Sequence, residues 1–318
     1  MGVYNGADYL RDAMESVLSQ TGINYEFVIV NDGSTDDTAA ILAEYQADQR
    51  VRVIEQENQG LTAALIRGCA EARADLIARQ DADDVSLTGR LAALVKLLRE
   101  HPNSVMASSL TQNVGPKNEP LFVVERSADP EIATHKLLDE RCGPPAHGSV
   151  MFRRSAYEKV GGYRIEFYYG QDSDLWLRLA RIGQIVYAQQ VYYVFRRSQG
   201  SISGSARDFQ REFGRIGQEC HKARMKGMDE APFLGAAEEL RRQVIEYRLK
   251  CKVNRSCSAM ANYFIGSTLL ARRDVRGISY LISALRANAG LLRAWVRLII
   301  GLCRFPWLNR PVELRPES

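Results

Sequence analysis

Apolar and polar positions follow one another in blocks along the first eighty residues, and the blocks predict helices and strands in turn. Leu10, Met14, Val17 and Leu18 fall at helical spacing, whereas residues 26–30 are rich in β-formers. The expected elements are helix 7–20, strand 26–30, helix 36–46, strand 51–54, helix 60–73 and strand 75–80. This alternation is typical of a parallel sheet covered by helices on both faces.

The pattern changes after residue 100. Strands are expected at 104–109 and 149–152, a helix at 172–180, and two short strands within 185–197. Residues 112–146 form a long segment with Pro and Gly punctuation, and beyond about residue 205 the spacing is helical. We therefore expect an α/β domain over residues 1–204 and an α-helical region over 205–318.

Charge divides the chain in a similar way. Residues 1–200 hold 21 Lys/Arg against 27 Asp/Glu, and residues 201–318 hold 21 against 11. A basic C-terminal region could bind nucleic acid, contact an anionic membrane or form a solvated helical surface. No nucleic-acid motif is visible, so we expect no nucleic-acid partner.

The six cysteines, at 69, 142, 220, 251, 257 and 303, show no paired metal-site spacing. We expect reduced thiols, no signal peptide and no membrane-crossing segment, which together predict a cytoplasmic protein.

Candidate chemistry gathers in residues 80–84, where Asp81, Asp83 and Asp84 follow the apolar run 76–78. Carboxylates at the end of a strand are good ligands for a hard divalent cation that also holds a diphosphate. Asp-rich turns also serve purely structural roles, so this segment alone leaves both interpretations open.

Further motifs occur in a fixed order around this segment. They are Val3-Tyr4-Asn5-Gly6, residues 16–21, Asn31-Asp32-Gly33-Ser34-Thr35-Asp36, Asn58-Gln59-Gly60, Asp81-Ala82-Asp83-Asp84, residues 147–154, Gly161-Gly162-Tyr163 and residues 171–178. Together they resemble the inverting glycosyltransferases of family 2, which have the GT-A fold, a Rossmann-like and mostly parallel mixed sheet.

The resemblance implies a site for a nucleoside-diphosphate sugar, UDP- or dTDP-linked. Asp32 would bind the base, Asp81 the ribose or the metal, and Asp83 a Mn²⁺ or Mg²⁺ ion. The full set implied for the nucleotide sugar is Tyr4, Asn5, Asp32, Asp81, Ala82 and Arg67. For Asp32 the alternative is a turn or cap, and for Arg67 a solvated helix surface.

The resemblance also implies that Asp172 is the general base, which removes a proton from the acceptor hydroxyl. The alternative for Asp172 is a helix N-cap, a role that we expect for Asp174. Gln171, His147 and Trp176 would line the acceptor side. A structural role for His147 is an equal alternative, and core packing is favoured for Trp176.

The chain departs from the family pattern at several positions. The apolar first strand that normally precedes the Val-Tyr-Asn motif is missing, so we expect an exposed edge or gap beside the base site. Gln171 replaces the usual Glu, and no His follows Phe195-Arg196, which leaves the metal geometry open.

The C-terminal region contains an apolar stretch over residues 291–307 with Arg293, Arg297 and Arg304 near one helical face. This composition is typical of a helix that lies in a membrane surface, and the alternative is a helix packed on the protein or on another subunit. A location at the inner face of the cytoplasmic membrane would suit acceptors carried on a polyprenyl lipid.

Three functional hypotheses follow. The first is a metal-dependent inverting sugar transferase for a saccharide or lipid-linked saccharide in cell-surface polysaccharide synthesis. The second is an N-terminally truncated, non-catalytic relative that binds a nucleotide sugar or a membrane partner. The third is a nucleotidyltransferase, which is disfavoured because no Gly-rich phosphate loop lies near the start.

Overall fold

The structure is a computed structural model that describes residues 1–197, 207–250 and 255–304. Its contacts divide the chain into two compact units. Unit 1 comprises Met1–Asn113, Phe122–Arg196 and Arg207–Lys250, and unit 2 comprises Val114–Leu121, Arg197–Ala206 and Cys251–Ser318. Both units contain chain from before and after residue 204, so the contacts divide the chain differently from the expected boundary.

A three-stranded parallel sheet begins unit 1, with strand order β1-β2-β3. Its strands are β1 (Gly2–Val3), β2 (Phe27–Asp32) and β3 (Val51–Gln56), and the helices that connect them and follow them are α1 (Leu10–Leu18), α2 (Thr38–Glu44) and α3 (Leu61–Glu71). The predicted alternation of helix and strand is therefore confirmed here. Leu10, Met14 and Ile29 are fully buried where α1 packs against β2.

The second sheet has six strands in the order β4-β8-β6-β9-β5, and β7 pairs with β6. The strands are β4 (Leu76–Ala78), β5 (Val85–Ser86), β6 (Ser104–Val114), β7 (Pro120–Val124), β8 (Met151–Arg153) and β9 (Gln184–Arg196). The pairs β4–β8, β6–β8 and β5–β9 are antiparallel, so the two sheets together make a mixed α/β architecture.

Successive residues of these strands enter two different cores, because side chains alternate across a sheet. Ala107, Met151 and Val186 pack with α4 (Arg90–Glu100) on one face. Their neighbours Met106 and Phe152 pack on the other face. That face is covered by α3, α5 (Pro130–Glu140), α6 (Arg154–Lys159) and α7 (Gln171–Ala180). Helices therefore cover both faces of the six-stranded sheet, as predicted.

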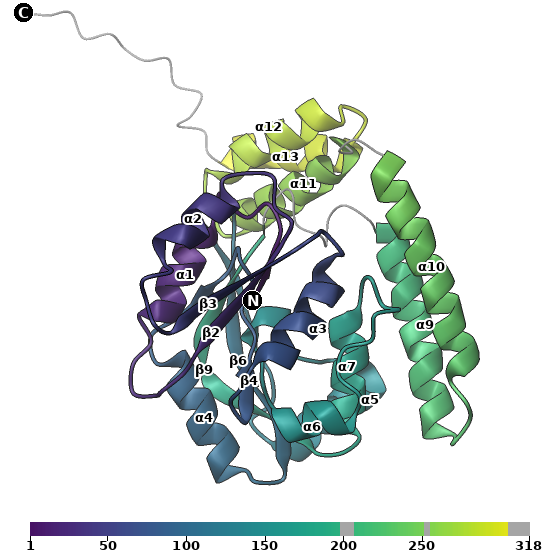
Figure 1. Ribbon diagram of the computed structural model, residues 1–318. Helices are drawn as coiled ribbons and strands as arrows, with labels where there is room; N and C mark the ends of the chain where they lie inside the picture. Colours follow the sequence, from purple (N-terminus) through teal and green to yellow (C-terminus); the bar gives the residue numbers. More distant parts are fainter. Residues whose placement is uncertain (198–206, 251–254, 305–318) are drawn as a thin grey trace, which may run out of the picture. The chain divides into compact units, whose positions relative to one another are not determined.

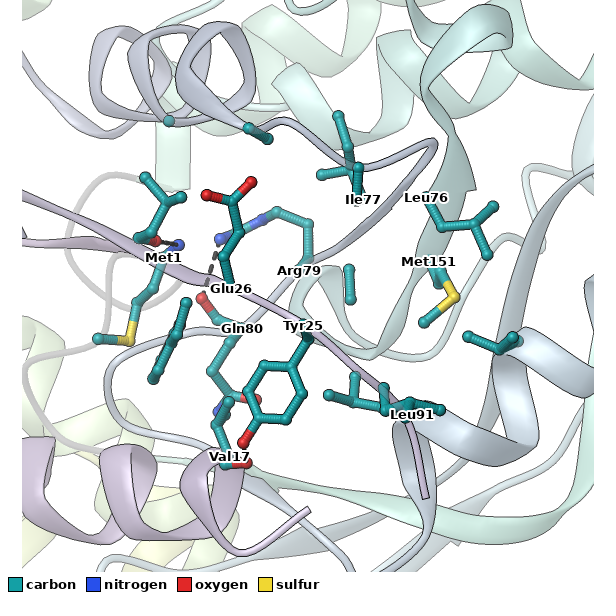
Figure 2. Close-up of a pocket in the computed structure, with 18 of the residues that line it drawn as sticks. Met1, Val17, Tyr25, Glu26, Leu76, Ile77, Arg79, Gln80, Leu91 and Met151 are labelled. Carbon is teal, nitrogen blue, oxygen red and sulfur yellow. Dashed lines mark hydrogen bonds between the residues drawn. The ribbon is translucent and has the colours of Figure 1, made fainter. Parts of the chain in front are cut away.

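A groove of about 520 Å³ lies between β2 and β4 and is lined largely by apolar side chains (Figure 2). Met1 reaches into it, and its amino group donates to Val28 O at 2.8 Å. Burial, together with the nearby Arg79 guanidinium, lowers the pKa of this amino group to about 5. Only Gly2 and Val3 form β1, and the expectation that a longer first strand is missing stays a prediction.

Helices α9 (Arg207–Met225) and α10 (Ala231–Lys250) form a hairpin that belongs to unit 1 (Figure 1). The start of α10 is tied to the segment before α7 by Glu230, which binds Arg164 at 2.6 Å and also pairs with Arg224. Arg224 in turn lies 3.7 Å from Asp174 on α7. These ion pairs explain why the hairpin groups with the α/β core.

Unit 2 contains α11 (Arg255–Ala271), α12 (Gly277–Ala287) and α13 (Leu292–Arg304). Helices α11 and α12 cross closely at Gly266 and Gly277, where a Cβ on Gly277 would lie 2.6 Å from Gly266 O. Leu270, Leu281 and Ala284 form the core, and Leu298 of α13 completes it. The predicted helical C-terminal region is confirmed for the residues that the structure describes.

One prediction about secondary structure is wrong, and one segment contains elements for which no prediction was made. Residues 184–196 form the single strand β9 rather than two short strands, because their β-branched and aromatic residues are not interrupted by Gly or Pro. Residues 112–146 contain β7 and α5, of which α5 begins at the Asp129 cap and Pro130.

Three of the cysteines, Cys69, Cys142 and Cys220, are free thiols, as expected. The side chains of the other three lie outside the described residues.

Candidate active site

The acidic turn follows β4 at the end of the six-stranded sheet and is closed by its own backbone. Asp84 N donates to Asp81 O at 3.3 Å, and the Gln80 side-chain amide donates to Asp84 O at 2.9 Å. From β9, Tyr193 accepts a hydrogen bond from Asp81 N at 3.2 Å, and Arg196 N donates to Asp84 Oδ1 at 2.8 Å. The turn is therefore held by residues more than a hundred positions away.

The three carboxylates of this turn differ in their surroundings. Asp84 is fully buried, and its burial raises its pKa well above the ordinary value. Burial and the neighbouring Asp81 raise the pKa of Asp83 to about 6. Burial also works to raise the pKa of Asp81, but the Arg79 guanidinium outweighs it and holds that pKa below the usual range. Asp84 is thus structural, while Asp81 and Asp83 are half-buried at the site.

Two buried arginines support the turn from behind. Arg79 forms an ion pair with Asp81 and donates to Gln80 O at 2.9 Å. Arg90 of α4 donates to Ser86 Oγ at 2.7 Å, to Arg79 O at 2.8 Å and to Gly148 O at 2.5 Å, and its guanidinium lies 4.7 Å from the centroid of the Tyr193 ring. Burial lowers the pKa of Arg90 to about 10, so it keeps its charge at neutral pH.

His147 and Asp172 lie beside this turn. His147 is in a short 3₁₀ helix (His147–Ser149), and its Nε2 shares a hydrogen bond of 2.7 Å with the Tyr163 hydroxyl. Burial, assisted by the positive charge of Arg79, lowers the pKa of His147 to about 3, so its ring is neutral at physiological pH. His147 therefore has the structural partners of the alternative interpretation and also lies next to Asp81 and Arg79.

Asp172 lies in the first turn of α7, where its Oδ1 accepts a hydrogen bond from Ser173 N at 2.8 Å. Burial raises the pKa of its carboxyl group, the Ser173 N–H works against that effect, and the negative charge of Asp81 adds to it. Asp81 and Asp172 are 91 positions apart in the sequence, and the fold brings them into one electrostatic environment.

The other acceptor-side candidates face inward. Gln171 is buried, and Trp176 is part of the core that includes α5 and α7. Trp176 also lies edge-on to His147, with ring centroids 6.0 Å apart. The cap expected from Asp174 is wrong, because the N-cap is Gly170 and the Asp174 carboxylate instead binds Arg178 at 2.6 Å.

Asp32 lies at the end of β2 and is almost fully buried against the loop between β3 and α3. Its carboxylate accepts from the Gln56 amide at 2.7 Å, from Gln59 N at 2.9 Å and from Gly60 N at 2.8 Å. The loop-holding role is thus shown by the structure, and contact with a nucleotide base stays a prediction.

Tyr168 lies against this loop. A Cβ on Gly60 would fall 2.9 Å from the Tyr168 ring, and the Tyr168 hydroxyl accepts from Arg248 of α10 at 2.6 Å. The negative charge of Asp32 contributes to the raised pKa of Tyr168, although burial is the larger cause. Tyr168 therefore connects the Asp32 loop with the segment that leads into Asp172.

The remaining nucleotide-side candidates are found at the surface. Tyr4 is exposed, and Asn5 adopts φ 50° while its side chain accepts from Thr35 N at 2.7 Å. Ala82 lies within the acidic turn. Arg67 is exposed on α3 and pairs with Glu71 at 3.1 Å, which matches the solvated-surface alternative.

Sequence reasoning missed the arginines and Tyr193 behind the acidic turn. Arg79 could have been noticed because it interrupts the buried run 76–80 immediately before the acids. Arg90 and Tyr193 had no such signal, since an arginine on a helix and a tyrosine on a strand are ordinary surface patterns.

Comparison with known proteins fits this arrangement. A family model described as glycosyl transferase family 2 matches residues 1–161, half of the chain. The chain belongs to this family. It is 32% identical to the putative glycosyltransferase EpsE of Bacillus subtilis over an alignment of 191 residues. This alignment covers 58% of this chain and 66% of EpsE. The chain is 47% identical over 85 residues to the putative glycosyltransferase EpsH of the same organism, covering 26% of this chain and 25% of EpsH.

Solved structures share the fold of this family 2 chain. The crystal structure of residues 1–349 of TarS from S. aureus in complex with UDP-GlcNAc superposes with a TM-score of 0.58 at 16% sequence identity, covering 98% of this chain and 91% of that one. At this identity the likeness shows the GT-A-like fold alone. The chain spans no more than about two thirds of the curated relatives named above.

Proposed function

We propose that this family 2 protein is a metal-dependent inverting glycosyltransferase. It would move a sugar from a nucleoside diphosphate, UDP or dTDP, to a hydroxyl of a saccharide or lipid-linked saccharide. EpsE and EpsH, described as putative glycosyltransferases, support sugar transfer, and the complex of TarS with UDP-GlcNAc supports a nucleotide-sugar donor. A role in cell-surface polysaccharide synthesis is part of the same proposal.

One observation carries the proposal: α7, which has Asp172 in its first turn, lies beside the acidic turn. Trp176 of α7 is edge-on to His147, and His147 contacts Arg79, the ion-pair partner of Asp81. The negative charge of Asp81 also adds to the raised pKa of Asp172, of which burial is the larger cause. A sugar transferase of this kind needs a base on one side of the anomeric carbon and charge stabilisation for the leaving diphosphate on the other. In this proposal α7 carries the base, and the end of β4 carries the carboxylates that would hold the cation.

The acidic turn fits a divalent cation by the chemistry of its donors. Asp81 and Asp83 offer carboxylate oxygens, which Mg²⁺ and Mn²⁺ prefer. In the part of the chain that the structure describes, no three His, Cys, Asp or Glu side chains form a complete metal cage. Cations of this type are commonly held by one or two carboxylates together with substrate phosphates, so two carboxylates suffice. When bound, the ion would offset the charge on the leaving diphosphate.

Three residues of the chain have separate roles in the proposed reaction. Asp172 accepts the proton of the acceptor hydroxyl as that oxygen attacks the anomeric carbon, and the raised pKa of its carboxyl suits it to this role. Arg79 fixes the orientation of Asp81 through their ion pair. Neutral His147, held by Tyr163, lines the same region without adding a charge.

The test is release of nucleoside diphosphate from a panel of UDP- and dTDP-sugars with Mn²⁺ and Mg²⁺, using the wild-type protein and Asp172→Asn. We expect Asp172→Asn to lower turnover by about 10²- to 10⁴-fold, the usual contribution of a general base, with nucleotide binding kept. The matched control is Asp208→Asn, which removes a carboxylate whose side chain is 97% exposed on α9 and should leave turnover unchanged.

Nucleotide binding without turnover in the wild-type protein would favour the non-catalytic alternative, and equal turnover in Asp172→Asn would remove Asp172 as the base.

A further inference from the structure

Helix α13 in unit 2 leaves a stripe of large apolar side chains uncovered. Leu292, Trp295, Val296, Ile299 and Ile300 are between 41% and 75% exposed. The helix packs on α11 and α12 through its opposite side, where Ala294 and Leu298 are buried. Five exposed residues of this kind on one helix form an interaction surface, because single exposed apolar residues are normal but a contiguous stripe is not.

The arginines of α13 lie along one border of this stripe. At about 100° per residue, the exposed apolar residues centre on the direction of Leu292, the buried ones lie nearly opposite, and Arg293 and Arg297 fall between the two. This is the position from which a long cationic side chain can reach the charged layer of a surface into which its apolar neighbours are inserted.

The charged residues of helices α11 to α13 are almost all positive. Residues 255–304 contain eight arginines and a single acid, Asp274, which pairs with Arg276 at 2.6 Å. A second copy of this surface would bring two strongly positive faces together, which disfavours self-association. An anionic surface is the complementary partner.

We propose that α13 docks the protein on an anionic phospholipid bilayer, lying in the plane of the membrane with its apolar stripe inserted at the headgroup boundary. The stripe supplies the apolar area and the arginines supply the attraction to anionic lipid, the two contributions that such helices combine. No helix within residues 1–197, 207–250 and 255–304 combines the length and apolar composition needed to traverse a membrane. Residues 305–307 of the predicted apolar stretch lie outside the described residues.

This proposal does not depend on the transferase activity, because the surface belongs to unit 2 and the candidate active site to unit 1. Vesicle binding and nucleotide binding are therefore measured separately, and either can fail alone. If both hold, the docking surface would bring the enzyme to acceptors carried on membrane lipids.

The experiment is co-sedimentation of the full chain with vesicles of phosphatidylcholine alone and of phosphatidylcholine mixed with phosphatidylglycerol. We expect binding to the mixed vesicles, weakened by salt, and little binding to the neutral ones. Ile299→Glu, or independently Val296→Glu, should lower the partition coefficient by about tenfold or more. The double variant Arg293→Gln/Arg297→Gln should lower it by about fivefold for each arginine on anionic vesicles only.

The matched control is Ile132→Glu, which places the same charge on an isoleucine that is 48% exposed on α5. It should bind vesicles like the wild-type protein, and circular dichroism and UDP binding should be unchanged in all variants. The proposal is overturned if the wild-type chain does not bind anionic vesicles, or if Ile299→Glu and Val296→Glu bind as well as it does. It is also overturned if the stripe instead mediates a lipid-free dimer that Ile299→Glu dissociates.

Discussion

The guanidinium of Arg79 forms an ion pair with the carboxylate of Asp81, two residues further along the chain. The Arg79 side chain is 3% exposed and that of Asp81 is 20% exposed, so the pair lies at the boundary between the core and the site. Its arginine also contacts His147, with Nε donating to His147 Nε2 at 3.4 Å. The buried Arg79 guanidinium thus contacts both the acidic turn and the neighbouring histidine.

Replacing Arg79 should therefore destabilise the protein and weaken donor binding together. We expect Arg79→Met to lower the free energy of unfolding by about 3 kcal/mol, because it leaves Asp81 without its buried partner. The control is Arg215→Met, which breaks the exposed pair with Glu212 on α9 and should cost less than about 1 kcal/mol. Urea denaturation and calorimetric titration with UDP and Mn²⁺ measure the two effects. Equal losses of stability and of UDP affinity in the two variants would contradict a special role for Arg79.

The raised pKa of Asp172 predicts how turnover depends on pH. A base must be ionised to accept a proton, so kcat/KM should fall on the acid side, with a midpoint above the ordinary pKa of a carboxyl group. The pH profile of diphosphate release measures this midpoint. A profile that stays flat down to the ordinary carboxyl range would contradict the assignment.

The same shift has a consequence for stability. Because the folded pKa of Asp172 lies above the unfolded one, the ionised carboxylate destabilises the folded state at pH values above both. Asp172→Asn should therefore raise the melting temperature at neutral pH, and the gain should shrink as the pH falls toward the unfolded value, where Asp172 is protonated in both states. Thermal melts across this range test the sign. Asp208→Asn serves again as the exposed control.

Gly60 joins the Asp32 loop to Tyr168, and its substitution should disturb both. Gly60 has φ 91°, and an added Cβ would lie 2.9 Å from the Tyr168 ring. Gly227 has φ 67° but no heavy atom within 4 Å of such a Cβ. Gly227→Ala therefore measures the cost of a positive φ without a clash, about 1–2 kcal/mol. Gly60→Ala should cost at least about 1–3 kcal/mol more, from the clash and from its ψ of 162°, which together with its φ only glycine adopts readily. Only Gly60→Ala should weaken UDP binding. Weakened binding in Gly227→Ala would instead indicate a general loss of structure.

Arg90 should be one of the least replaceable side chains in unit 1. It donates to Ser86, Gln80, Arg79 and Gly148 from a fully buried position. We expect Arg90→Met to lower the free energy of unfolding by about 3 kcal/mol or more, because buried acceptors lose a charged donor. Arg99→Met, which changes an exposed arginine of the same helix, should stay within about 0.5 kcal/mol. Chemical denaturation of both variants tests this prediction. Similar denaturation midpoints for Arg90→Met and Arg99→Met would contradict it.

The sequence predicted the order of the first elements and the place of the acidic turn because these depend on local signals. Strand β2 and helix α1 have clear periodicity, and Asp81 and Asp83 follow an apolar run. The packing behind them could not be predicted in the same way. Arg79 and Arg90 look like ordinary charged residues until the fold buries them, and Asp174 looks like a cap until Arg178, Arg164 and Arg224 surround it.

The candidate site residues also differ in how far the sequence could predict their surroundings. Asp172 and Asp81 were named from motifs, and the fold brings them into one environment. For Arg67 the described contact, a surface ion pair, matches the solvated-helix alternative. Asp32 instead anchors the loop between β3 and α3, a role that neither the base contact nor the turn-or-cap alternative included. A linear motif identifies a residue, but the number of its hydrogen-bond partners is a property of the folded chain.

The hydrogen bond from Asp81 N to Tyr193 closes a loop of 112 residues, and the bond from Arg196 N to Asp84 is equally distant. Contacts of such separation form late, since the entropy of loop closure must be overcome before they contribute. The acidic turn would then acquire its final shape only after β9 has joined the sheet. A nascent polypeptide that has emerged from the ribosome only as far as residue 180 would carry every acid of the site. It would still lack Tyr193 and Arg196, whose hydrogen bonds hold the acidic turn.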